Sequence, residues 1–204
     1  AIVMEVRTGA IKAIANLGYD NNGLLAENFN YAVGNSTEPG STLKLASVAA
    51  MMEEQRVDLH TPIDLNGGVY YFYNRKMPDS ELHGVGMSDL EYAFIKSSNV
   101  GISRLAFNSF GTPEGQKKFA SYYKKFGLTE PTQIDLEGEP LPVVKHPVKD
   151  KDKWYGTTVP WMSVGYELQL TPLQVLTFYN GIANNGRVMK PYLVSSVMDN
   201  EVEI

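Results

Sequence analysis

The stretch Glu38-Pro39-Gly40-Ser41-Thr42-Leu43-Lys44 stands at the start of the most apolar run of the chain, which extends from Leu43 to Met52. Pro39 and Gly40 end an irregular region, and residues 41–55 are rich in Leu, Ala, Met and Glu without a helix breaker. This composition predicts a helix over residues 41–55 that is apolar around most of its circumference and therefore buried.

Ser41 and Lys44 are three residues apart, so on this helix their side chains share one face and lie within reach of each other. An apolar environment lowers the pKa of a lysine, which allows Lys44 to be the free amine that takes the serine proton. Backbone N–H groups at the helix start stabilise negative charge that develops on a substrate. The spacing favours a serine nucleophile with its own base, although a helix cap and a surface lysine would give the same pattern.

A second polar cluster, Ser97-Ser98-Asn99, separates two short stretches that are predicted to be helical. A hydroxyl in such a turn can relay a proton between Lys44 and an amine of the substrate. An asparagine amide can hold a substrate carbonyl and hydrogen-bond the lysine. Taken alone, however, the tripeptide is also an ordinary turn or capping sequence.

The remaining sequence predicts a mixture of helices, short strands and loops. Two β-prone runs around Arg7-Thr8-Gly9 predict a hairpin, and a Ser-x-x-Glu capping box at Ser88 and a Thr-Pro pair at Thr112 and Thr171 predict helix starts. The expected elements are strands at 1–6 and 10–15, helices at 88–95, 100–110, 113–126 and 172–185, a mobile loop at 138–153 and a terminal strand at 188–197.

Composition excludes several classes of protein. The 204 residues are 43% hydrophobic and 20% charged, which is typical of a globular chain with a real core. A formal net charge of −5 disfavours binding to nucleic acid or anionic lipid. The chain has no cysteine, hence no disulfide, and its three isolated histidines, His60, His83 and His146, give no reason to expect a metal site.

The two motifs in this order, Ser41-Thr42-Leu43-Lys44 and then Ser97-Ser98-Asn99, resemble the signature of penicillin-binding proteins and serine β-lactamases. Further motifs extend the resemblance to the transpeptidase domain of class B penicillin-binding proteins over essentially the whole chain. These motifs are Ser163-Val164-Gly165-Tyr166, Leu170-Thr171-Pro172-Leu173-Gln174, and Ala183-Asn184-Asn185-Gly186 with Lys190-Pro191. Within the class, Asn99 resembles the division-specific, septal type, because an aspartate commonly takes its place in the elongation type.

The resemblance implies an α+β fold of the penicillin-binding-protein and β-lactamase type, with an antiparallel sheet flanked by helices. It implies a D,D-transpeptidase that cross-links peptidoglycan stem peptides ending in D-Ala-D-Ala through an acyl-serine and is acylated by β-lactam antibiotics. The roles it implies are Ser41 as nucleophile, Lys44 as general base, Ser97 as proton shuttle and Asn99 as positioning residue. No metal or organic cofactor is expected.

The resemblance also implies a place in the cell. Members of the family act outside the cytoplasmic membrane, on the periplasmic side, anchored by an N-terminal helix, and we expect septal cell-wall proteins as partners. Two other functions stay open for the same fold: a serine β-lactamase, and a non-catalytic penicillin sensor or divisome scaffold. No glutamate of the chain has an asparagine four residues later, which argues against a class A β-lactamase.

The third motif of the family, Lys-Thr-Gly or Lys-Ser-Gly, does not occur, because no lysine of the sequence is followed by Thr-Gly or Ser-Gly. In the family, the strand that bears it supplies an oxyanion N–H group and holds the substrate carboxylate. We therefore expect residues 1–204 to be a partial transpeptidase domain without its C-terminal strands, which by itself acylates poorly or not at all. An incomplete sheet also leaves an open edge, through which the chain is expected to self-associate.

Overall fold

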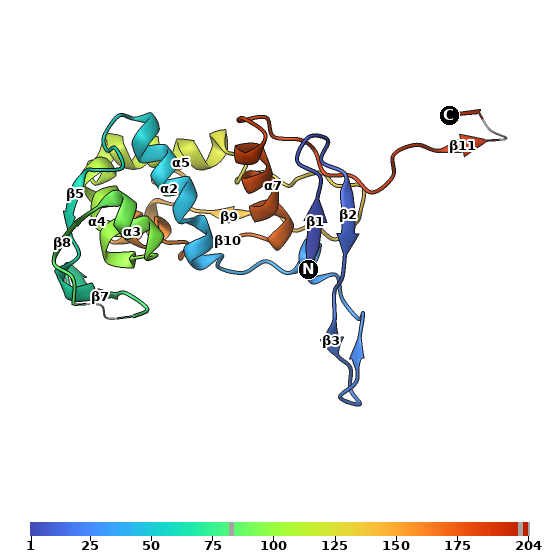
Figure 1. Ribbon diagram of the computed structural model, residues 1–204, viewed down its shortest axis with the longest axis horizontal. Coiled ribbons are helices and arrows are strands. Elements are labelled where there is room, and N and C mark those ends of the chain that lie inside the picture. The colour runs from blue at the N-terminus through green and yellow to red at the C-terminus, as the bar shows by residue number, and fades with distance from the viewer. Residues whose placement is uncertain (82–83, 200–201, 204) are drawn as a thin grey trace. The chain divides into compact units, whose positions relative to one another are not determined.

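The computed structural model describes residues 1–81, 84–199 and 202–203 (Figure 1). The chain divides into two compact units, and each is built from segments that are far apart in the sequence. Unit 1 comprises residues Ala1–Thr37, Gly127–Pro142 and Leu170–Ile204, whereas unit 2 comprises Glu38–Phe126 and Val143–Gln169. Both units mix helices with two-stranded antiparallel sheets, in agreement with the predicted α+β class.

Unit 1 contains the N-terminal hairpin and one long helix. Its elements are β1 (Ile2–Met4), β2 (Ile11–Ile14), β3 (Gly18–Tyr19), β4 (Leu25–Ala26), α1 (Tyr31–Gly34), α7 (Pro172–Ala183), β11 (Met198–Asp199) and β12 (Val202–Glu203). The strands pair as β1–β2, β3–β4 and β11–β12. The predicted hairpin and the predicted capping box of α7 at Thr171 and Gln174 are both confirmed.

The core of unit 1 forms where the hairpin and the two helices bring apolar side chains together. Met4, Val33, Ile134 and Leu173 are buried in one cluster, with isoleucines of β1 and β2 packed against it. These residues come from both ends of the chain and its middle, so the unit is closed by tertiary contacts rather than by neighbouring segments.

The predicted terminal strand at 188–197 is wrong. In that range Tyr192 forms a single bridge with Ala10, and no continuous strand follows. The backbone N–H groups of Leu193 and Val194 instead donate to the carboxylate of Asp135, at 2.8 and 2.7 Å. A side chain therefore takes the hydrogen bonds that a neighbouring strand would have supplied.

Unit 2 is mainly helical. Its helical elements are η1 (Gly40–Leu43), α2 (Lys44–Glu53), η2 (Asn66–Gly68), α3 (Leu90–Ile95), α4 (Asn99–Phe110), α5 (Pro113–Lys125), η3 (Lys151–Lys153) and α6 (Thr158–Met162). Its strands are β5 (Pro62–Asp64), β6 (Val69–Phe72), β7 (Arg75–Pro78), β8 (Met87–Asp89), β9 (Val143–Val144) and β10 (Leu168–Gln169), paired as β5–β8, β6–β7 and β9–β10.

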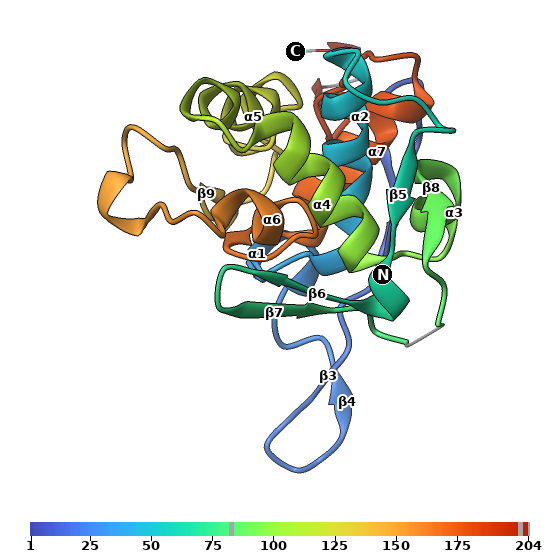
Figure 2. The ribbon, with the colours of Figure 1, turned by 90° about the vertical axis from the view of Figure 1, so that its left-hand side faces the viewer.

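Helix α4 is the centre of unit 2. It packs against α2 and also contacts α3, α5 and α6, as the second view shows (Figure 2). Its side is closely fitted, because a Cβ atom added at Gly101 would lie 2.6 Å from the Cβ atom of Ala93 and 2.8 Å from Leu65. Since α2 and α4 carry the two sequence motifs at their first turns, this packing brings the motifs together.

Two helix starts differ from the predictions. Residues Gly40–Leu43 form a 3-10 turn whose first residue, Gly40, has a left-handed φ of 57°, and the α-helix begins only at Lys44. The cap of α3 is Asp89, whose side chain accepts from the backbone of Tyr92. Ser88 cannot take that place because it is paired with Ile63 within β8.

Candidate active site

Ser41 lies in the 3-10 turn that leads into α2, and its side chain is exposed. Within the described part of the chain, its hydroxyl makes no hydrogen bond. The backbone just before it is held by Gly165, whose carbonyl accepts from the N–H group of Gly40 at 3.0 Å. Gly165 has a φ of 86°, and a Cβ atom there would lie 1.9 Å from the Gly40 carbonyl oxygen. Only glycine lets the two backbones approach so closely.

Lys44 is the first residue of α2 and is 1% exposed. Its ammonium group donates to the backbone carbonyl of Ser97 and, at 3.0 Å, to the Ser97 hydroxyl. Burial lowers the pKa of Lys44 to about 8, against the opposing effect of the negative charge of Asp79. With this pKa, about a tenth of Lys44 is the neutral amine at pH 7, beside a hydroxyl that can exchange protons with it.

Ser97 is placed by the end of α3. It has a left-handed φ of 54°, and the N–H groups of Ser97 and Ser98 donate to the carbonyls of Phe94 and Ala93 at 3.0 and 2.8 Å. A residue other than glycine in this region costs on the order of 1 kcal/mol, so neighbouring contacts must hold it there. This turn directs both oxygens of Ser97 to Lys44.

The next two residues face the end of β7 instead. The Ser98 hydroxyl caps α4 by accepting from Gly101 at 2.9 Å, and it donates to the carboxylate of Asp79 at 2.9 and 3.1 Å. The amide nitrogen of Asn99 donates to the carbonyl of Pro78 at 2.8 Å. Lys44 and Ser97 are thus in direct contact, whereas Asn99 is tied to Pro78 beside them.

Asp79 is the residue of this site that the sequence analysis missed. It is 7% exposed and, besides Ser98, it accepts from the N–H group of Val100 at 2.9 Å. Its position after a short strand carries no motif, so nothing in the spacing of the sequence distinguishes it from acids on the surface. With Ser97 it also lines a cavity of about 400 Å³, together with Ser80, Glu81, Tyr92 and Lys96.

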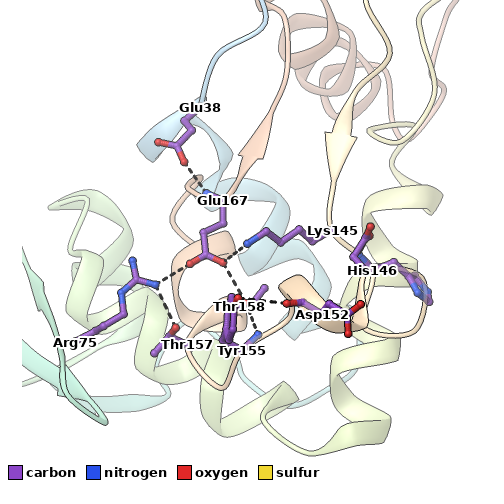
Figure 3. A network of polar contacts seen from close by, with 10 residues as sticks. Glu38, Arg75, Lys145, His146, Asp152, Tyr155, Thr157, Thr158 and Glu167 are labelled. Carbon is purple, nitrogen blue, oxygen red and sulfur yellow. Dashed lines mark hydrogen bonds and ion pairs between the residues drawn. The ribbon is translucent and has the colours of Figure 1, made fainter.

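A second polar cluster of unit 2 surrounds Glu167 (Figure 3). Its carboxylate is bound by Arg75 and Lys145, each at 2.8 Å, and by the Thr158 hydroxyl at 3.1 Å. Burial by itself would raise the pKa of Glu167, but the hydrogen bonds from Lys145 and Arg75 bring it below its usual value. The backbone N–H of Glu167 also donates to Glu38 at 2.8 Å, so this cluster reaches the segment that precedes Ser41.

Two properties of the described residues bear on other kinds of function. Residues 1–81, 84–199 and 202–203 contain no group of three or more histidines, aspartates and glutamates arranged to hold a metal ion. His83 lies outside these residues. In the same ranges no helix combines the length and the apolar character that a membrane crossing requires.

Comparison with known proteins gives one consistent result. The family model described as the penicillin binding protein transpeptidase domain matches residues 1–203. Penicillin-binding protein PbpB of Mycolicibacterium smegmatis is 28% identical over 97% of this chain and 30% of its own length. Peptidoglycan D,D-transpeptidase FtsI of Escherichia coli K12 is 30% identical over 97% of this chain and 32% of its own length.

Solved structures agree. The apo crystal structure of penicillin binding protein 3 from Mycobacterium tuberculosis superposes with a TM-score of 0.80 and 26% identity, over 100% of this chain and 45% of that one. The present chain thus spans about a third of the length of the curated relatives that it matches.

Proposed function

We propose that this chain, which belongs to the penicillin binding protein transpeptidase domain family, carries the nucleophile and the base of a peptidoglycan D,D-transpeptidase. Membership in this family and the α+β fold confirm the resemblance that was drawn from the motifs at Ser41 and Ser97. The relatives named FtsI and PbpB support the class B, division-specific type.

The observation that carries the proposal is the state of Lys44. It is buried, donates to Ser97 and stands at the first turn of the helix that follows the exposed Ser41. A lysine with a pKa of about 8 is a suitable base near neutral pH, because a useful fraction of it is unprotonated while it still accepts a proton readily.

In the proposed reaction, the Ser41 hydroxyl oxygen attacks the carbonyl carbon of the penultimate D-alanine of a stem peptide. Lys44 takes the hydroxyl proton, and the tetrahedral intermediate collapses by breaking the peptide C–N bond. The leaving amine of the terminal D-alanine receives its proton through the Ser97 hydroxyl. An amine of a neighbouring stem peptide then attacks the ester, which forms the cross-link and returns the proton to Ser41.

Asn99 is assigned a positioning role in this reaction. Its amide nitrogen is already bound to the Pro78 carbonyl, so the orientation of the amide group is fixed before substrate arrives. A fixed amide contributes to binding without losing conformational freedom in the complex. No step of the reaction requires a metal or an organic cofactor.

The wider setting is part of the same proposal. We assign the site to peptidoglycan strands outside the cytoplasmic membrane, with β-lactams as acylating inhibitors at Ser41 and a role in septal wall synthesis with septal partner proteins. The match to the family model and to the relative named peptidoglycan D,D-transpeptidase supports this setting.

The test is covalent labelling of the intact protein, meaning the complete gene product that carries residues 1–204, with a fluorescent penicillin, followed by mass spectrometry of the peptide that contains Ser41. Residues 1–204 by themselves are expected to acylate poorly or not at all, so they are not the sample for this test. We expect one label on Ser41 in the wild type, complete loss in Ser41→Ala, and full labelling in Ser121→Ala, which removes an exposed serine hydroxyl of the same unit. Labelling of Ser41→Ala, or an unlabelled wild type, would contradict the proposal.

A second readout separates the alternatives of the same fold. A transpeptidase keeps the label for hours and releases D-alanine from a D-Ala-D-Ala peptide. Rapid hydrolysis of the penicillin would indicate a β-lactamase, and stable labelling without any release of D-alanine would indicate a sensor.

A further inference from the structure

The segment Pro78-Asp79 lies along the turn Ser97-Ser98-Asn99 and holds it at several points. The Asp79 carboxylate accepts from the Ser98 hydroxyl and from the N–H group of Val100, and the carbonyl of Pro78 accepts from Asn99. Asp79 is itself fixed, because its own N–H donates to the carbonyl of Gly68 at 2.8 Å. The turn is therefore bound to the Pro78-Asp79 segment, which is itself hydrogen-bonded to Gly68.

Ser97, the first residue of the same turn, is the hydrogen-bond partner of Lys44. The carbonyl and hydroxyl oxygens of Ser97 both accept hydrogen bonds from Lys44, while the hydroxyl of the next residue, Ser98, donates to Asp79. A movement of Asp79 would shift Ser98 and with it Ser97, which already has a strained backbone. Small displacements of this kind are costly in active sites, where a shift of about 1 Å can lower a rate by about 100-fold.

We propose that Asp79 is a positioning residue for the reaction of Ser41, because its carboxylate fixes the Ser97-Ser98-Asn99 turn against Lys44 and places one negative charge near that lysine. The proposal rests on the proposed function of Ser41 and Lys44 and adds to it a group that acts through the Ser97-Ser98-Asn99 turn.

The charge has a separate, measurable consequence. The negative charge of Asp79 raises the pKa of Lys44, against the larger effect of burial, which lowers it. Among the described residues, the other titratable groups of this region are Glu81, Tyr92 and Lys96, which line the cavity that Asp79 and Ser97 share. Removing the charge of Asp79 alone should therefore lower the pKa of Lys44 further, whereas a purely structural role would not.

The experiment is the pH dependence of the second-order rate constant for acylation of the intact protein by a fluorescent penicillin. Its acid limb reports the deprotonation of Lys44 in the free enzyme. For Asp79→Asn, which keeps the size of the side chain, we expect the acid limb to move down by roughly one pH unit and the plateau to fall about tenfold or more.

Two further variants separate charge from position. Ser98→Ala keeps the charge of Asp79 but removes the hydroxyl that links it to the turn, leaving the hydrogen bond from the Val100 N–H group, so its plateau should fall while the acid limb stays at the wild-type pH. Glu53→Gln removes an exposed acid from the same helix as Lys44 and should leave both quantities unchanged.

The outcomes are distinguishable. A wild type that is not acylated at Ser41 contradicts the proposed function itself. An acylated wild type together with a folded Asp79→Asn whose acid limb is unmoved overturns the role of Asp79. If Asp79→Asn does not fold, Asp79→Glu replaces it: a lower plateau with an unmoved acid limb supports the proposal, and a wild-type plateau overturns it.

Discussion

Two lysines of unit 2, Lys44 and Lys145, are both withdrawn from solvent but have opposite surroundings. Lys145 binds the carboxylate of Glu167 directly at 2.8 Å, in a cluster that also includes Arg75. Lys44 binds two uncharged oxygens of Ser97, and the negative charge of Asp79, which is hydrogen-bonded to Ser98, raises its pKa only in part against the effect of burial. The positive charge of Lys145 is therefore balanced by a direct ion pair, whereas the pKa of Lys44 is lowered by burial.

The difference shows how one unit can hold both a structural and a reactive lysine. A carboxylate in contact stabilises the charged form of an amine and makes it a poor base. Hydroxyl and carbonyl partners satisfy the hydrogen bonds of a buried lysine without supplying a full opposite charge. Burial and partner both separate the two roles, since Lys44 is 1% exposed and binds uncharged oxygens, whereas the side chain of Lys145 is 21% exposed and binds a carboxylate.

The largest expected effect comes from removing each lysine in turn. Lys44→Met should lower the rate constant for acylation of Ser41 by about 1,000-fold, which is the range for loss of a general base. Lys145→Met should change it little, because Lys145 contacts no residue of the Ser41 site that is proposed to move a proton. Stopped-flow labelling with a fluorescent penicillin measures both, and equal losses would remove the distinction between the two lysines.

The same Lys44→Met variant should be more stable than the wild type. The pKa of Lys44 is about 8 in the folded chain against an ordinary value of 10.5, so the unfolded chain binds more protons between these values. The free-energy cost of burying the charged lysine is therefore present in full below pH 8, and it is relieved as the pH rises toward 10.5. We expect Lys44→Met to raise the free energy of unfolding by about 2 kcal/mol at pH 7.

Urea unfolding at pH 7 and pH 10 checks this expectation. The advantage of Lys44→Met over the wild type should shrink at the higher pH, because Lys44 is then neutral in the folded chain and no longer buries a charge, although it is still mostly protonated in the unfolded chain. Lys145→Met is the matched control and should be less stable than the wild type at both values. A constant advantage of Lys44→Met would mean that the lysine is not desolvated.

The smallest effect concerns Glu167. Glu167→Gln keeps the shape of the side chain but loses its charge, and it should lower the free energy of unfolding at pH 7 by about 1 kcal/mol. The folded pKa of Glu167 lies below its usual 4.5, so its contribution is present above that value and is lost as the pH falls through the folded value. Thermal unfolding from pH 7 to pH 3 should show the wild type and the variant converging, while the exposed Asp152→Asn follows the wild type throughout.

The sequence was sufficient for the features that depend on local pattern. An apolar helix with one lysine predicted the burial of Lys44, and the order of the two motifs predicted that Ser97 would meet it. The caps at Thr112 and Thr171 were also correct, because a side chain that accepts from the N–H group three residues later is a local interaction.

Features that depend on distant contacts were out of reach. The burial of Asp79 depends on Gly68 and on the first turn of α4, and the Glu167 cluster joins residues up to 129 positions apart. The prediction of a strand at 188–197 was wrong for the same reason. A strand needs a partner strand, but the backbone N–H groups of Leu193 and Val194 donate to the distant side chain of Asp135 instead. The predicted self-association through the sheet edge stays a prediction.

The contact between Gly165 and Gly40 restricts how this protein can vary. Every other amino acid at position 165 would put a Cβ atom on the Gly40 carbonyl and would also have to adopt a φ of 86°. A library of random substitutions selected for growth should therefore retain glycine at this position, while the half-exposed Tyr166 next to it accepts replacements. Variation near Ser41 is therefore confined to side chains that can be exchanged, because this point of the backbone offers no alternative residue.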